Sequence, residues 1–115
     1  MDLTAAQIIE ASDLAALKVT VNEWGGGDVY IRLMTVGERD AHELEWLNNK
    51  EKGVDNFRSK FLARCLSDAK GVRLFSDAEV PLLSKKSCVV MHRLWTQAMA
   101  HNALSEEDVQ AIAGE

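Results

Sequence analysis

Two alternating segments separated by glycines constrain the fold of this chain most strongly. Apolar side chains alternate with other residues over 17–21 and again over 29–34, which is the period of a half-buried strand. Trp24 and the glycine run that begins with Gly25 and Gly26 lie between them, and glycine tolerates the positive φ of a tight turn. The sequence therefore predicts a β-hairpin over 17–34. Because an isolated hairpin is barely stable in water, its apolar face needs a helical cover.

Helical signals flank the hairpin. Thr4 and Gln7 form a capping box that predicts a short helix over 5–11, which is too short to be stable alone and must either dock or fray. Thr35 and Glu38 form a second capping box, with apolar residues at helical spacing as far as Leu47.

The strongest amphipathic pattern follows, as an apolar stripe from Val54 to Leu66. The opposite face carries Arg58, Lys60 and Arg64, which we interpret as a solvated basic face. A brief extended piece is expected over 72–75.

Three further helices are expected after that extended piece. A short one is capped by Ser76 and contains Pro81, a long one runs from Ser84 or Lys85 to Asn102, and a final short one follows Ser105, with Val109 and Ile112 facing inward. The expected fold class is α+β, with an N-terminal β-hairpin packed on a mainly helical bundle. We expect a single domain over 1–115, divided into an N-terminal helical segment (1–16), the hairpin (17–34) and a helical part (35–113).

Composition excludes several classes of function. The chain has 115 residues, 47% of them hydrophobic, and a formal net charge of −5. A negative chain gains nothing from counterion release on DNA or RNA, so we expect no nucleic-acid partner. No apolar run approaches the roughly 20 residues that span a bilayer, and the first residues do not form a secretory signal, so we expect a cytoplasmic protein without a membrane partner.

The chemistry-bearing residues do not form a recognisable active site. Cys65 and Cys88 each lie on an apolar stripe and are interpreted as buried thiols. His92 follows Cys88 by one helical turn, which leaves a cysteine nucleophile as a minor alternative. His42 is interpreted as a solvated or capping side chain, and the carboxylates around it scatter about their helix. We therefore expect no enzyme, no cofactor and no metal site.

Several short motifs occur in an order that resembles one protein family. They are IEASDL (9–14), VTVNEWG (19–25), VYIR (29–32), TVGERD (35–40), GVRLFSD (71–77), LSKKS (83–87) and LSEEDV (104–109). Together they resemble the tail assembly chaperones of long-tailed bacteriophages, which are encoded just upstream of the tape-measure protein. Val36 and Gly37 depart slightly from the usual order of the family motif.

The resemblance implies a noncatalytic function. Such a chaperone binds the tape-measure protein, and in longer forms the major tail protein of the tube, in the host cytoplasm, and it is absent from the mature virion. The alternative is a structural component of the phage tail or of the head–tail connector. Self-association into a homo-oligomer is a further expectation.

A partner for a long, apolar-striped helical protein needs an exposed apolar surface rimmed by charge. Five residues are candidates for that surface: Trp46, Leu47, Leu94, Trp95 and Met99. The alternative interpretation places all five in the core. Trp24, Gly25, Gly26, Thr35 and Glu38 are expected to serve the structure, at the turn and at the helix start.

Overall fold

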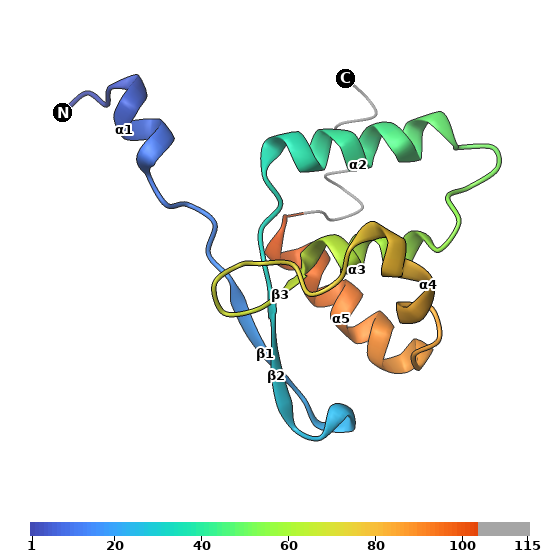
Figure 1. The fold of residues 1–115 in the computed structure, drawn as a ribbon. Helices are drawn as coiled ribbons and strands as arrows, with labels where there is room; N and C mark the ends of the chain where they lie inside the picture. Colours follow the sequence, from blue (N-terminus) through green and yellow to red (C-terminus); the bar gives the residue numbers. More distant parts are fainter. Residues whose placement is uncertain (104–115) are drawn as a thin grey trace.

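A computed structural model of the chain describes residues 1–103. Five α-helices and a three-stranded sheet follow one another within these residues (Figure 1). In chain order the elements are α1 (Ala5–Glu10), β1 (Leu17–Val21), the 3-10 turn η1 (Asn22–Trp24), β2 (Gly27–Ile31), α2 (Val36–Asn48), α3 (Phe57–Cys65), β3 (Leu66–Ser67), the 3-10 turn η2 (Asp77–Glu79), α4 (Val80–Leu83) and α5 (Cys88–His101). The α+β class, with an N-terminal hairpin followed by helices α2 to α5, is thus confirmed. The helix expected after Ser105 lies outside the described residues.

The predicted hairpin is present. Strands β1 and β2 pair antiparallel, with Leu17 opposite Ile31 and Val21 opposite Gly27. Gly25 and Gly26 have φ of +81° and +74°, the left-handed region that glycine adopts without steric cost. Strand β2 ends earlier than the sequence predicts, at Ile31.

A third strand escaped the sequence analysis. Leu66 and Ser67 form β3, which pairs antiparallel with β2 opposite Ile31 and Tyr30. Leu66 continues the apolar spacing of the preceding helix, so the pattern assigned it to that helix. The predicted helix over 54–66 was therefore too long at both ends, because α3 begins at Phe57 and ends at Cys65.

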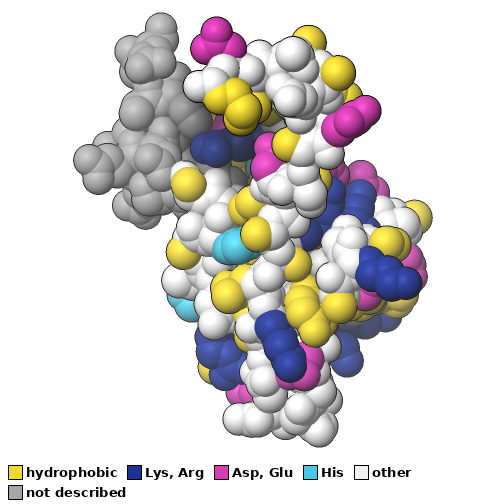
Figure 2. All heavy atoms as spheres, turned by 90° about the vertical axis from the view of Figure 1, so that its left-hand side faces the viewer, with side chains coloured by type: hydrophobic (Ala, Val, Ile, Leu, Met, Phe, Trp, Pro, Cys, Tyr) yellow, Lys and Arg dark blue, Asp and Glu magenta, His cyan; other side chains and the backbone are white. Residues whose placement is uncertain are grey.

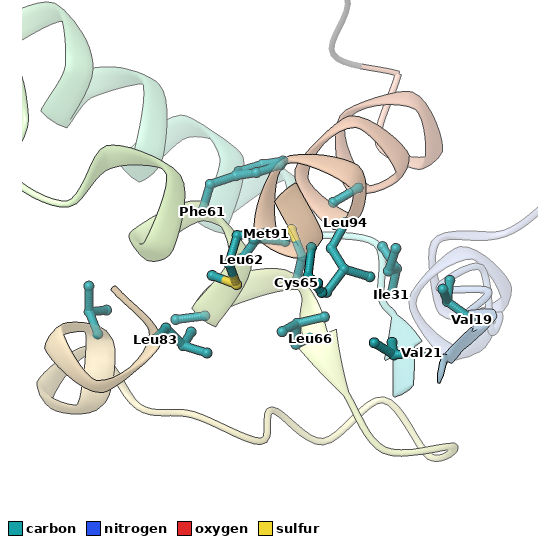
Figure 3. Packing of buried hydrophobic residues seen from close by; sticks show 14 of the residues in the cluster. Val19, Val21, Ile31, Phe61, Leu62, Cys65, Leu66, Leu83, Met91 and Leu94 are labelled. Atoms are coloured by element: carbon teal, nitrogen blue, oxygen red, sulfur yellow. The ribbon is translucent and has the colours of Figure 1, made fainter. Parts of the chain in front are cut away.

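The core lies where α3 and α5 cross, with the sheet on one side and α4 on the other (Figure 3). Phe61, Leu62 and Cys65 of α3 face Met91 and Leu94 of α5. The sheet adds Val19, Val21 and Ile31, and α4 adds Val80 and Leu83. This arrangement gives the hairpin the helical cover that it needs.

A buried amide fixes the end of α5 against the end of the sheet. The side-chain nitrogen of Asn102 donates hydrogen bonds to the carbonyl oxygens of Arg32 (3.2 Å) and Ala98 (2.9 Å). Its side-chain oxygen accepts from the backbone N–H of Met34 at 2.8 Å. Since Asn102 is only 8% exposed, these bonds replace those that water would make.

Helix α1 stands apart from the rest of the described molecule (Figure 1). Its capping box forms as predicted, but none of its residues is buried. Leu3, Ile8 and Ile9 are 63%, 59% and 83% exposed. Figure 2 views the molecule from this side, and hydrophobic side chains are spread among the charged ones over the face that it shows. No helix within residues 1–103 is long and apolar enough to cross a membrane.

Candidate partner-binding surfaces

Helix α2 starts on the predicted capping box. The Thr35 hydroxyl accepts from the backbone N–H of Glu38 at 3.1 Å, and the Glu38 carboxylate accepts from the backbone N–H of Thr35 at 2.9 Å. The Arg32 guanidinium donates to both carboxylate oxygens of Glu38, at 2.7 and 3.0 Å. These charge-assisted hydrogen bonds hold the pKa of Glu38 at about 2. The start of α2 is therefore fixed to the end of the sheet.

The inner face of α2 contacts α3 through His42. The His42 ring lies 5.9 Å from the ring of Phe57 and 5.3 Å from that of Phe61, measured between centroids. Its Nδ1 is 2.7 Å from a guanidinium nitrogen of Arg64. Burial, and then the charge of Arg64, lower the pKa of His42. The expectation of a solvated or capping His42 was wrong, because the side chain fills the space between two aromatic rings.

Two basic residues of α3 complete this contact. Lys60 donates to the Glu45 carboxylate at 3.0 Å, and Arg64 lies 3.4 Å from the other oxygen of Glu45. These ion pairs lower the pKa of Glu45. The interpretation of Lys60 and Arg64 as a solvated face was therefore wrong, since both join α3 to α2; Arg58 remains exposed.

The outer face of α2 is open to solvent and carries exposed apolar side chains, with Asp40 among them. No residue of α2 is buried. Val36, Leu44 and Leu47 are 79%, 57% and 44% exposed, and their spacing places them on one side of the helix. Trp46 is 37% exposed and lies under the ammonium of Lys50, 5.5 Å from the ring centroid. Two of the five candidate contact residues, Trp46 and Leu47, thus lie at the surface.

The other three candidates lie on α5 and belong to the core or its edge. Leu94 is completely buried, so a partner cannot reach it in this fold. Its spacing along the helix matches the core stripe, which a sequence pattern cannot distinguish from a surface stripe. Trp95 and Met99 are partly buried and pack against the core. The guanidinium of Arg58 lies over the Trp95 ring, 5.4 Å from its centroid.

A groove that the sequence analysis missed lies between α3, α4 and α5. Its volume is about 500 Å³, and its lining residues are Asn56, Phe57, Arg58, Ser59, Leu83, Ser84, Lys86, Cys88, Met91 and His92. These residues come from the beginnings of two helices and the end of a third, so no single amphipathic stripe marks the groove in the sequence. The basic residues Arg58 and Lys86 in its lining were the feature of the sequence that could have indicated it.

The two cysteines differ in their surroundings. Cys65 is completely buried, as predicted, and burial raises the pKa of its thiol to about 12. Cys88 is exposed, which contradicts the prediction of a buried thiol. It is the first residue of α5, where the preceding turn of helix that would cover it is missing. Within residues 1–103, no group of His, Cys, Asp and Glu side chains is arranged to hold a metal ion.

Comparison with solved structures adds one decisive observation. The structure of the bacteriophage HK97 tail assembly chaperone matches this chain with a TM-score of 0.60 over 88% of this chain and 92% of that one. The chain has the fold of a bacteriophage tail assembly chaperone. Sequence identity over the match is 21%, so the likeness concerns the fold. The sequence matches no model of a protein family and no curated protein.

Proposed function

We propose that this chain is a noncatalytic chaperone of phage tail assembly that binds the tape-measure protein before the tail polymerises. The fold shared with the HK97 tail assembly chaperone is the observation that carries the proposal. In this proposal the chain acts in the host cytoplasm, hands the tape-measure protein to the growing tail with or without the major tail protein, and is absent from the finished virion.

The outer face of α2 is the proposed contact surface. A long helical partner with an apolar stripe aggregates when it is free, because the stripe stays in water. Leu44 and Leu47 offer an apolar ridge on which such a stripe can pack, and Trp46 adds a large amphipathic side chain at the edge of the face, on the side of His42. The contacts of His42 and Glu45 with α3 hold α2 in place. A partner can therefore bind the ridge without any opening of the core.

Co-expression tests this surface. The tape-measure protein encoded in the same genome is produced with the chain, and the soluble fraction of the tape-measure protein is measured. We expect the unmodified chain to keep it soluble and the Leu44→Asp/Leu47→Asp variant to lose most of that effect, because two carboxylates in an apolar contact are costly to desolvate. Val72→Asp is the control for an added surface carboxylate, since Val72 is 60% exposed and follows β3 rather than lying on α2.

Two results would contradict the proposal. The tape-measure protein would precipitate equally with and without the chain, or mass spectrometry would find the chain in purified virions. The second result would favour the alternative, a structural component of the tail or of the head–tail connector.

Self-association is a further part of the proposal. Leu3, Ile8 and Ile9 on and beside α1 are exposed and make no contact with the core, so a second copy of the chain can bury them. Light scattering measures this directly, and a mass equal to that of one chain at high concentration would contradict it.

A further inference from the structure

The groove between α3, α4 and α5 has an apolar floor and a basic rim. Phe57 supplies a half-buried aromatic ring to the lining, while Leu83 and Met91 form the bottom of the groove and are only 2% and 6% exposed. The side chains of Arg58 and Lys86 supply positive charge. Leu82 and Val89, the neighbours of two lining residues in the sequence, are 55% and 70% exposed. An open groove of about 500 Å³ accommodates one or two large side chains of a partner.

The charge of the rim is unusual for this chain. No carboxylate is among the lining residues, although the chain as a whole carries a net charge of −5. Within the described residues, Arg58 forms no ion pair, whereas the arginines at 32, 39, 64, 73 and 93 all do. Lys86 also forms none there, as is common among the exposed lysines of this chain. The N-terminus of α5, a helix of 14 residues, adds partial positive charge beside the groove. The groove is therefore a local positive site on a negative molecule.

We infer that this groove binds an acidic segment of a protein partner, with one or two large apolar side chains on the floor and carboxylates against Arg58 and Lys86. The inference rests on the proposed function, in which the partner is a phage tail protein, and it specifies the chemistry of the segment that is bound. Charge complementarity is the argument, because carboxylates replace the ion pairs that these cations lack. Lys86, Cys88 and His92 are all exposed, so the groove is open to a partner.

Trp95 places a spectroscopic reporter at the edge of the groove. The Arg58 guanidinium lies over one face of its ring, and the His92 ring stacks near it, with the two centroids 6.0 Å apart. A carboxylate that pairs with Arg58 changes the electric field at the indole, and with it the fluorescence. The groove and the outer face of α2 lie on different elements, so each can be altered without the other.

The experiment measures binding of a fluorescein-labelled peptide by anisotropy. The probe carries Leu and Phe on one helical face and Glu at its other positions, and a matched peptide carries Lys in place of Glu. We expect the acidic peptide to bind the full chain at least about tenfold more tightly than the basic one. Added NaCl is expected to weaken the binding, because it screens the rim charges.

Variants of the chain locate the binding. Lys86→Glu and Arg58→Glu are each expected to weaken the binding of the acidic peptide about tenfold, while Arg58→Lys is expected to keep most of the affinity. Lys70→Glu is the matched control, because Lys70 is exposed, forms no ion pair within the described residues and lies in the turn after β3. Circular dichroism confirms that each variant folds. The chain has three tryptophans, so Trp95 fluorescence is read with Trp24 and Trp46 replaced by Phe, and it is expected to respond to the acidic peptide.

Four results would overturn the inference: no binding, equal binding of the two peptides, equal loss in Lys70→Glu and Lys86→Glu, or binding only after removal of residues 104–115. The last result would assign the groove to the acidic segment of the chain itself, which contains Glu106, Glu107 and Asp108. Failure of the tape-measure co-expression would instead contradict the proposed function and leave the peptide result standing.

Discussion

At the scale of single residues, burial separates side chains that the sequence pattern treats alike. Leu47 and Leu94 both occur at helical spacing among apolar neighbours, yet Leu47 is 44% exposed and Leu94 is completely buried. The pattern gives the apolar face of a helix but not the depth at which that face is buried. This is why the sequence analysis placed both residues on one candidate surface and left their burial in the core as the alternative.

Alanine substitution distinguishes the two leucines. Leu94→Ala is expected to lower the free energy of unfolding by about 2–5 kcal/mol, because it leaves a cavity in the core. Leu47→Ala is expected to cost less than about 1 kcal/mol while weakening the proposed tape-measure contact. Chemical denaturation of both variants measures the difference. Equal costs would contradict the assignment of Leu94 to the core and Leu47 to the surface.

His42 makes the stability of the protein depend on pH. Its pKa in the folded chain lies below the ordinary value of 6.5, so the unfolded chain takes up the proton more readily. The contribution to stability is therefore full above about pH 7 and is lost as the pH falls below 6.5 towards the lowered pKa. Denaturation at a series of pH values measures this loss.

The matched variant is His42→Gln, whose amide oxygen can still accept from Arg64. In this variant the decrease in stability below pH 6.5 is expected to disappear. The decreases in stability at lower pH are expected to remain, because they come from Glu38 and Glu45, whose pKa values are lowered by ion pairs. An unchanged decrease below pH 6.5 in His42→Gln would show that another group titrates.

At the scale of elements, local signals were predictable from the sequence and long-range pairing was not. The hairpin and the capping boxes at Thr4 and Thr35 each depend on residues close together in the chain, and all three are confirmed. Strand β3 has two residues and exists because Leu66 meets Ile31, far away in the sequence. Nothing local marks such a strand. The basic groove was hidden for the same reason, since three separate elements build it.

Asn102 tests how the elements are joined. Asn102→Ala is expected to lower the free energy of unfolding by about 1–3 kcal/mol, because the backbone N–H of Met34 and the carbonyl of Arg32 lose their partner in a buried place. Hydrogen exchange is expected to show faster exchange at the amide of Met34 and in the last turn of α5. Unchanged exchange at Met34 would contradict the role of this side chain in joining α5 to the sheet.

At the scale of the whole molecule, the fold combines a sealed core with open apolar surfaces. Buried residues of α3, α5 and the sheet stabilise the chain, while α1, the outer face of α2 and the exposed Leu82 and Val89 keep large apolar side chains in water. A compact monomer with every large apolar side chain buried would have no apolar surface with which a chaperone could bind its partner. The exposed surfaces and the tail assembly chaperone fold support the same proposal.

Native mass spectrometry of the purified chain mixed with a soluble fragment of its tape-measure protein tests the central proposal most directly. We expect a complex of the two polypeptides, which is depleted when the chain carries Leu44→Asp/Leu47→Asp and retained with Val72→Asp. Spectra that contain only the separate polypeptides at every ratio, with the fragment folded, would contradict it.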